Sequence, residues 1–416
     1  MPLHIPPALH HRSFRLLWIG LAISVAGSQM QIWALLWHVR ILTDQPIALG
    51  GIGLARILPV IVFSLIGGAV ADSANRRTIL FVTQSVMAVV ALVLAWLTYQ
   101  GQITLWQIYL LTAIQATALA FDLPARQALV PNLVPPEDLP NAFSMQSIAF
   151  QVGSIVGPAL SGLVIAYGGQ YYTYLINSIT FLAVIGALLL IGPIPQHTRG
   201  SGRIQIKFAD IAEGIRFILG QPVILSSMIL DFFATFFSSA NTLMPIFARD
   251  ILHVGAVEYG WLSAAQSIGA MAAAAIISQL KEIRHQGKTL LVSVVAFGIA
   301  TIFFGLSRTF FGAVIALIFI GASDSVSAII RNTIRQLQTP DYIRGRMTSI
   351  NQIFFLGGPQ LGEVEAGLVA QLFGAPAAVI TGGIGCLLAV GWIARRWPQL
   401  WNYNGDEPIK AGAVGD

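Results

Sequence analysis

The chain has 416 residues, of which 56% are hydrophobic and only 10% charged, with a formal net charge of +5 and a mean hydropathy of +0.74. Because a soluble domain carries about 25% charged residues, this composition excludes an ordinary soluble protein and indicates an integral membrane protein. The single cysteine, Cys386, excludes an internal disulfide and a multi-cysteine metal site.

Twelve apolar segments are long enough to cross a membrane, because a spanning helix needs about 20 mostly apolar residues. We predict them at 14–38, 47–70, 78–99, 103–124, 142–167, 171–192, 222–247, 256–280, 288–307, 309–331, 347–371 and 375–397. The even number places both termini on the same side. No cleavable signal is evident before the first segment, which we expect to act as its own insertion signal.

Basic residues indicate which side that is. With the N-terminus in the cytoplasm, all 23 Lys and Arg residues fall at cytoplasmic ends and loops except Arg40, Arg249 and Arg308 outside and Arg56 within a span. Cytoplasmic loops of membrane proteins carry such an excess of positive charge. We therefore predict cytoplasmic termini, and the basic balance needs no nucleic-acid partner.

The longest loop between spans, 193–221, separates six spans from six. Within it Ile211, Ile215, Ile218 and Leu219 fall at helical spacing, which predicts an amphipathic helix on the cytoplasmic membrane face. The predicted organisation is an N-terminal six-helix bundle at 1–192, this linker at 193–221, a C-terminal six-helix bundle at 222–397 and a cytoplasmic tail at 398–416.

The two halves repeat one another in sequence. A shift of 205 residues places Arg126 on Arg331, and it aligns four glycines with four others: Gly153, Gly157, Gly162 and Gly169 with Gly358, Gly362, Gly367 and Gly374. Parallel six-span repeats are a transporter architecture. The repeat therefore predicts an all-α membrane transporter built of two pseudo-symmetric six-helix bundles.

The loop "GGAVADSANRR" between spans 2 and 3 carries Gly68, Asp72, Arg76 and Arg77. Their spacing resembles a loop motif of the major facilitator superfamily, which the chain resembles over nearly its whole length. In that family the loop is a charge-relay latch, so the resemblance implies gating roles for these residues; the alternative is a basic loop with an incidental aspartate. Asn75 replaces the usual glycine, and we expect the turn to survive because Asn tolerates a left-handed conformation.

The stretch "GSIVGPALSG" in span 5 resembles the antiporter motif of exporters in this superfamily. Gly153, Gly157, Pro158 and Gly162 match, while Ser161 replaces a glycine. Glycines four residues apart clear a groove for another helix, and we expect span 8, which span 5 meets in this family, to occupy it. The alternative is ordinary small-residue packing with no bearing on transport direction.

Two longer stretches narrow the resemblance. "FDLPARQALVPNLVPPEDLPNAFSMQS" at 121–147 and "GGPQLGEVEAGLVAQLFG" at 357–374 resemble a bacterial branch that includes the enterobactin exporter, macrolide efflux pumps and transmembrane secretion effector proteins. This resemblance implies a bacterial inner-membrane location but names no substrate.

Three aspartates lie within predicted spans, where a charge costs about 2.5–3.5 kcal/mol and so suggests a function. Asp231 in span 7 and Asp324 in span 10 are the main candidates for proton coupling; a structural hydrogen bond or an ion pair with Arg331 is the alternative. Asp122 in span 4 is a further candidate, although Arg126, four residues on, favours a local ion pair.

Arg56 in span 2 and Glu363 and Glu365 in span 11 are also intramembrane charges. These spans face each other in the superfamily, so a bridge from Arg56 to Glu363 or Glu365 would form in one state and break in another. Alternatively, each charge contacts the cavity or the substrate. We assign gating or charge-relay roles to Glu363 and Glu365 and to the paired arginines Arg126 and Arg331.

Further substrate-cavity candidates are Gln29 and Gln31 in span 1 and Phe232 and Phe236 in span 7, with Arg56. The glutamines are equally suited to hydrogen bonds between helices, and the phenylalanines to lipid or helix contacts.

The sequence thus predicts a secondary active transporter, working as a monomer, that exports amphipathic small molecules, such as a drug or siderophore, in exchange for protons by alternating access. The alternatives are an importer or lipid flippase of the same fold, or a non-transporting membrane sensor or assembly protein. We expect no enzyme activity, cofactor or metal site, because "GKT" at 287–289 lacks the rest of a phosphate-binding loop and no hydrolase or metalloprotease motif occurs.

Overall fold

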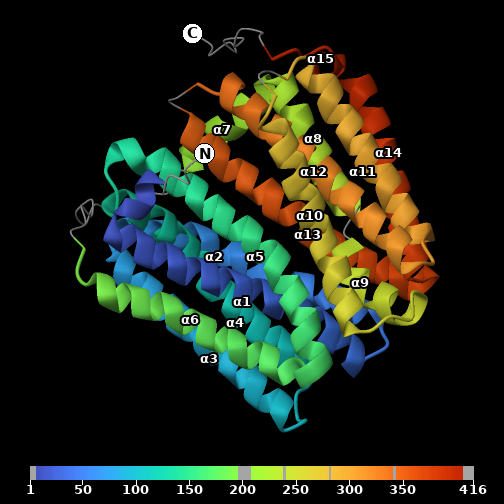
Figure 1. The fold of residues 1–416 in the computed structure, drawn as a ribbon. Coiled ribbons are helices and arrows are strands. Elements are labelled where there is room, and N and C mark those ends of the chain that lie inside the picture. Colours follow the sequence, from blue (N-terminus) through green and yellow to red (C-terminus); the bar gives the residue numbers. More distant parts are fainter. Residues whose placement is uncertain (1–5, 195–207, 238–239, 281–282, 341–342, 406–416) are drawn as a thin grey trace. The chain divides into compact units, whose positions relative to one another are not determined.

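The computed structural model describes residues 6–194, 208–237, 240–280, 283–340 and 343–405, and their regular structure is helical. Figure 1 shows the helices in chain order. They are α1 (Arg12–Leu42), α2 (Pro46–Ser73), α3 (Arg76–Tyr99), α4 (Leu105–Leu129), α5 (Leu139–Gly168), α6 (Gln170–Ile191), α7 (Phe208–Gly220), α8 (Pro222–Phe237), α9 (Met244–Ile246), α10 (Ala256–Ile277), α11 (Gln286–Leu306), α12 (Phe310–Gln338), α13 (Arg344–Phe373), α14 (Ala375–Arg396) and α15 (Pro398–Trp401).

Eleven spans are long and apolar enough to cross a membrane among the residues that the structure describes. The remaining predicted span, 347–371, is also one continuous helix, the 30-residue α13. Span 7 differs from its prediction at 222–247. Within the described residues α8 extends to Phe237, and from Ala240 onward the chain forms a 3₁₀ turn at Ala240–Leu243, α9 and a π-helical turn at Phe247–Ile251. Pro245 explains part of this break, because proline cannot donate the backbone hydrogen bond that a continuous helix needs.

The chain forms two compact units. Unit 1 comprises Met1–Asp44, Leu54–Ile204 and Gly255–Ala264, and unit 2 comprises Gln45–Gly53, Gln205–Val254 and Ala265–Asp416. The first turns of α2 therefore belong to unit 2 and the first turns of α10 to unit 1.

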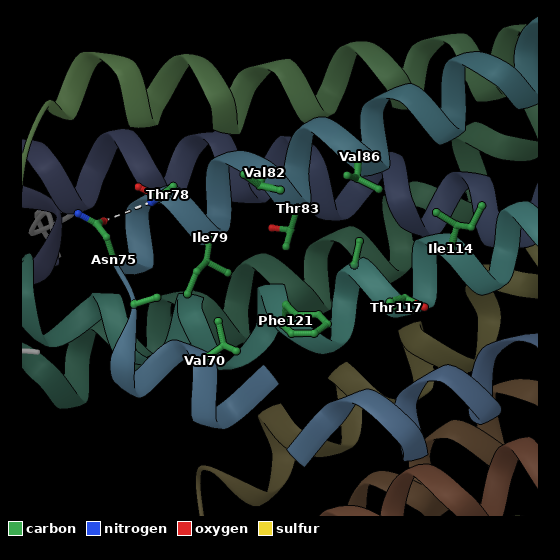
Figure 2. A pocket seen from close by; sticks show the side chains of 12 residues that line it. Val70, Asn75, Thr78, Ile79, Val82, Thr83, Val86, Ile114, Thr117 and Phe121 are labelled. Atoms are coloured by element: carbon green, nitrogen blue, oxygen red, sulfur yellow. Dashed lines mark hydrogen bonds between the residues drawn. The ribbon is translucent and has the colours of Figure 1, made fainter. Parts of the chain in front are cut away.

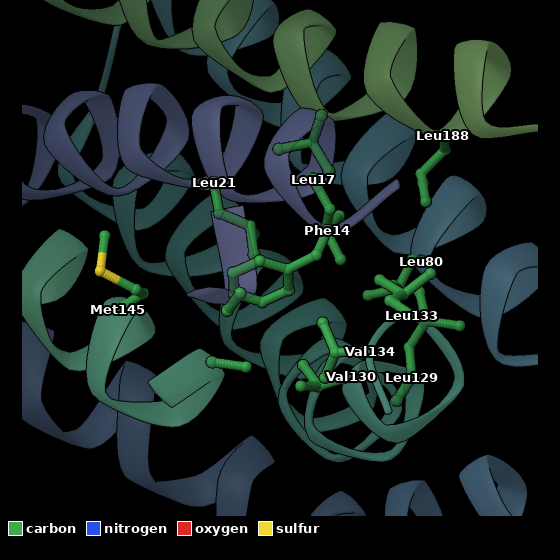
Figure 3. Packing of buried hydrophobic residues seen from close by; sticks show 14 of the residues in the cluster. Phe14, Leu17, Leu21, Leu80, Leu129, Val130, Leu133, Val134, Met145 and Leu188 are labelled. Atoms are coloured by element: carbon green, nitrogen blue, oxygen red, sulfur yellow. The ribbon is translucent and has the colours of Figure 1, made fainter. Parts of the chain in front are cut away.

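In unit 1, α1 packs against α5 and α6, and α3 packs against α4 and α6. One end of this unit has a dense apolar core (Figure 3). Phe14, Leu17 and Leu21 of α1 meet Leu129 at the end of α4 and Met145 of α5 there. The core fixes the ends of three helices against each other and so holds the polar residues further along them in register.

In unit 2, α11 packs against α12 and α14, and α8 packs against α13 and α14. The linker helix α7 forms as predicted and contacts α13 and α8. Of its expected apolar stripe, Ile218 is buried with Met228 and Met347, whereas Ile215 and Leu219 are exposed. Ile211 lies outside the residues whose side chains are described. An exposed apolar edge is compatible with a helix that rests on a membrane surface.

The repeat found in the sequence is visible at two turns. Gly169 joins α5 to α6 with φ of +81°, and Gly374 joins α13 to α14 with φ of +88°. Both backbones lie in a region that residues with a side chain rarely adopt, which explains why glycine occupies the same position in each half.

Candidate functional site

A buried ion cluster joins α8 and α12 in unit 2. An Nη2–Oδ1 distance of 2.8 Å pairs Arg331 with Asp231, and both side chains are about 5% exposed. Arg331 also donates a hydrogen bond to the hydroxyl of Ser327. A second carboxylate, Asp324, lies 3.9 Å from the same guanidinium, and its side chain is 45% exposed.

Helical spacing places three of these residues together. Asp324, Ser327 and Arg331 are three and four residues apart on α12, so they share one face of that helix, and α8 supplies Asp231 opposite them. The sequence predicted an ion pair with Arg331 as the alternative to proton coupling by Asp231 and Asp324. The structure shows this ion pair, with Asp231 closer to Arg331 than Asp324 is, and the proton-coupling roles stay predictions. Two acids of different exposure thus share one arginine.

A second buried carboxylate lies in unit 1. Asp122 is fully buried on α4 and pairs with Arg126 one turn further along, which confirms the predicted local ion pair. Thr83 and Gln84 of α3 donate hydrogen bonds of 3.0 and 2.8 Å to its Oδ1 atom. These two donors were not predicted from the sequence, where their only signal is a pair of adjacent polar residues in an apolar helix.

The repeat-related arginines are therefore neutralised in different ways. Arg126 pairs with Asp122 on its own helix, and the repeat places Ser327 at the position equivalent to Asp122 in unit 2. Arg331 therefore pairs with Asp231 on another helix, α8. The Asp122 carboxylate is fully buried and accepts hydrogen bonds from three side chains. In contrast, Asp324 is loosely held at the surface of its unit. Of the three candidate aspartates, Asp324 has the geometry best suited to exchange of a proton.

The glutamines of α1 make hydrogen bonds between helices. The Gln31 side chain is buried, donates to Gln115 of α4 and accepts from Asn177 of α6, both at 2.6 Å. Gln29 donates to Ser154 of α5 at 3.2 Å. The structure therefore shows hydrogen bonds between helices for both glutamines, and substrate binding by them stays a prediction.

Four phenylalanines of α8 form two stacked pairs. Phe233 stacks on Phe237, and these rings contact Trp392 and Gly385 of α14, so they pack within unit 2. Phe232 stacks on Phe236 with ring centroids 5.9 Å apart and an interplanar angle of 15°. The role of Phe232 and Phe236 at a substrate cavity stays a prediction.

The loop between α2 and α3 is held by its arginines. Arg76 donates to the carbonyl of Ala128 and to Asn132, at 3.0 and 2.9 Å, and Arg77 donates to the carbonyl of Leu188 at 3.0 Å. The predicted left-handed conformation of Asn75 is wrong: its φ is −67°, and its side chain accepts from the backbone N–H groups of Arg77 and Thr78 as the N-cap of α3. Gly68 has open space around it, and the side chain of Asp72 lies outside the described residues.

Comparison with known proteins places these features in a family. The model of the transmembrane secretion effector family matches residues 6–404. The chain belongs to this family of the major facilitator superfamily. It is therefore a multi-pass, all-helical membrane transporter and not an enzyme, as the sequence predicted.

Relatives and solved structures agree with this assignment. The transporter is 24% identical to the enterobactin exporter EntS of Citrobacter koseri over 405 residues, covering 97% of this chain and 96% of that protein. It is 25% identical to EntS of Shigella boydii over 383 residues, covering 91% and 90%. A bacterial homologue of the human lysosomal transporter Spinster, in an inward-facing conformation, superposes with a TM-score of 0.72 at 12% identity, covering 96% and 97%. A single-residue mutant of the nucleoside transporter NupG superposes with a TM-score of 0.75 at 12% identity, covering 92% of this chain and 99% of that one.

The glycines of "GSIVGPALSG" face two different partners. A Cβ atom on Gly153 would lie 2.7 Å from Val25 of α1, and one on Gly157 would lie 2.6 Å from the Cβ of Gln29 on the same helix. These two glycines thus pack against α1, and our expectation that they face span 8 is wrong. Gly162 lies against the first turns of α10, where its Cβ would be 2.9 Å from the Cα of Gly260, and the carbonyl of Pro158 also approaches Gly260. Pro158 lies inside the continuous helix α5.

The second copy of the repeat shows the same division of roles. A Cβ on Gly358 would lie against Thr235 of α8, and one on Gly367 would lie 3.2 Å from the Cα of Gly50 on α2. Spacing in the sequence identified a close helix approach in each half, but it did not identify the partner helix.

The remaining intramembrane charges lie in different units. Arg56 belongs to unit 1, whereas Glu363 and Glu365 belong to unit 2. Within unit 2, Glu363 lies against Gly53 of α2, where an added Cβ would be 2.8 Å from its Oε2 atom. The predicted bridge from Arg56 to either glutamate stays a prediction, as do the gating roles of Arg126 and Arg331.

Proposed function

We propose that this transporter exports amphipathic small molecules across a bacterial inner membrane by alternating access, in exchange for protons. In this proposal it works as a monomer with both termini in the cytoplasm. The observation that carries the proton-coupling part is the cluster in which Asp231 and Asp324 share Arg331.

In this proposal the cluster has two protonation states, one with Asp324 charged and one with Asp324 protonated. While Asp324 is charged, it competes with Asp231 for the single guanidinium. A proton on Asp324 removes that competition and leaves Arg331 fully with Asp231; when the proton leaves, Arg331 is drawn back toward Asp324. Because Asp231 is on α8 and the other two residues are on α12, this exchange changes the attraction between two helices, and a state that binds the proton better is then favoured.

Export of an amphipathic compound is supported by the relation to enterobactin exporters and by the partial antiporter motif at Gly153–Gly162. That relation is distant, so the substrate class is drawn broadly enough to include drugs and siderophores. Charges within spans of transporters commonly mark substrate or proton pathways.

The test is transport into proteoliposomes with an acidic lumen, using a panel of catecholate siderophores, macrolides and lipophilic dyes added outside. We expect at least one compound to accumulate only when the pH gradient is present. Asp324→Asn should abolish gradient-driven accumulation, while the matched variant Asp44→Asn, at an exposed aspartate paired with Arg40, should retain it. Accumulation that ignores the gradient would refute proton coupling, and failure of the whole panel would favour a non-transporting role.

A further inference from the structure

The start of α11 in unit 2 differs from the start of α3, its counterpart in the repeat. The shift of 205 residues that aligns these helices replaces Arg76 and Arg77 by Lys281 and Glu282. The carboxylate of a glutamate has no hydrogen to donate to a backbone carbonyl, so it cannot take over the role of Arg77. The N-cap of α11 is His285, and its side chain makes no capping hydrogen bond to any residue that the structure describes. A different part of the chain therefore has to hold the start of α11.

The loop before α3 shows what such a helix start requires. Asn75 caps α3 by accepting hydrogen bonds from the backbone N–H groups of Arg77 and Thr78, and Figure 2 shows its bond to Thr78. Arg76 then ties the start of α3 to the end of α4, through a 2.9 Å hydrogen bond to Asn132 just beyond that helix. The loop thus performs two tasks in unit 1, a cap and a tie.

The C-terminal segment 397–405 supplies the cap in unit 2. Its short helix α15 contacts α8, α11 and α14 (Figure 1). The carbonyl of Tyr403 accepts a 2.9 Å hydrogen bond from the backbone N–H of Gly287, the second residue of α11. Asn75 caps the equivalent N–H group, that of Arg77 as the second residue of α3. A backbone carbonyl from the end of the chain therefore replaces a local side-chain cap.

The same segment also supplies the tie. The hydroxyl of Tyr403 accepts a 3.2 Å hydrogen bond from the side chain of Gln338, the last residue of α12. Tyr403 therefore joins the start of α11 to the end of α12, as Arg76 joins the start of α3 to the end of α4. These are equivalent pairs of helices in the two halves.

This contact is closely packed. Leu400 and Tyr403 are 0% and 3% exposed. A Cβ atom on Gly287 would overlap the carbonyl oxygen of Leu400, so a glycine is needed where the segment lies against α11. The ring of Trp401 lies 5.9 Å from the ammonium group of the next residue, Lys288. The glycine of "GKT", which phosphate binding does not explain, thus has a structural reason.

We propose that residues 397–405 form a C-terminal clasp, which takes in unit 2 the place of the loop between α2 and α3 in unit 1. It caps α11 and ties that helix to the end of α12 through one residue, Tyr403. The two halves are therefore held at equivalent positions by segments that are far apart in the sequence. Because α12 carries Asp324 and Arg331, the clasp also fixes one end of the helix on which the proposed proton exchange acts.

The test is hydrogen–deuterium exchange of the full-length transporter in nanodiscs, followed by mass spectrometry of its peptides. Gly287→Ala places a Cβ where the segment lies and should release the clasp. We expect amide exchange at the start of α11 and the end of α12 to rise about fivefold, as for the loss of one hydrogen bond from a locally opening segment. Exchange at the start of α3 should not change. The matched control Gly391→Ala on α14, where an added Cβ finds open space, should change none of these regions. Unchanged exchange at the start of α11 in Gly287→Ala would overturn the proposal.

Further variants separate the cap from the tie. Tyr403→Phe loses the hydroxyl but keeps the carbonyl, so it should loosen the end of α12 and leave the start of α11 protected. It also tests the clasp if Gly287→Ala fails to fold, and an end of α12 that exchanges as slowly as in the natural protein would refute the tie. Truncation after Trp397 should loosen both regions, whereas truncation after Gly405 should loosen neither. Equal exchange in the two truncated proteins would overturn the clasp.

The equivalence of the two halves has its own measurement. Arg76→Gln should raise exchange at the end of α4 by a factor similar to that of Tyr403→Phe at the end of α12. It should leave α11 and α12 unchanged, because the clasp holds them independently of the loop. If the end of α4 exchanges as slowly as in the natural protein, the clasp has no counterpart in unit 1 and the equivalence is wrong.

Discussion

The pair of Asp231 and Arg331 allows a quantitative test of the buried cluster. Arg331→Gln leaves the Asp231 carboxylate buried without its counter-ion, and loss of one partner of a buried pair costs about 3–5 kcal/mol of unfolding free energy. Asp231→Asn should cost less, because Arg331 keeps its hydrogen bond to Ser327 and the nearby carboxylate of Asp324. A double-mutant cycle should therefore give a coupling energy of about 2–3 kcal/mol between the two residues.

The assay is unfolding of the purified transporter in mixed micelles by titration with sodium dodecyl sulfate, followed by circular dichroism. The chain supplies a matched control cycle in Arg40 and Asp44, an i,i+4 pair whose aspartate side chain is 88% exposed. This control should show only about 0.3–0.5 kcal/mol. A coupling energy for Asp231 and Arg331 no larger than the control value would refute the buried, closely paired cluster.

Two further substitutions test local packing. Gly157→Leu should greatly reduce the yield of folded protein, because a Cβ atom there would lie 2.6 Å from α1. Gly186→Leu on α6 should be tolerated, because an added Cβ finds open space. Size-exclusion profiles in detergent compare the two variants, and equal yields would contradict the close approach of α1 and α5. Asn75→Ala should lower the unfolding free energy by about 1 kcal/mol and Asn75→Gly by only a few tenths of a kcal/mol, as expected for an N-cap. Thermal-shift curves measure both variants. A glycine variant more stable than the natural protein would favour the left-handed turn instead.

Long-range organisation could be predicted from the sequence because it depends on composition and periodicity. Apolar runs of about 20 residues identify spans, and the register of Gly169 and Gly374 marks equivalent turns in the two halves. The break in span 7 was missed, although Pro245 and the polar residues Asn241 and Thr242 lie inside the predicted span. The mean hydropathy of a span carries no information on helix continuity, whereas an internal proline does.

The candidate site could be predicted only in part. Asp324 and Arg331 are seven residues apart on one helix, so their proximity follows from helical geometry. The approach of Asp231, and of Thr83 and Gln84 to Asp122, depends on which helices pack together. That choice is made by tertiary contacts such as Gly157 against α1, which spacing alone does not specify.

We propose that protons move through the transporter in exchange for substrate by way of the cluster at Asp324. The most direct measurement is the lumenal pH of proteoliposomes, reported by a trapped dye, after a transported compound is added outside an acid-loaded vesicle. We expect a substrate-dependent rise in lumenal pH for the natural protein and for Asp44→Asn, and none for Asp324→Asn. A rise of equal size in Asp324→Asn would contradict proton transfer through this cluster.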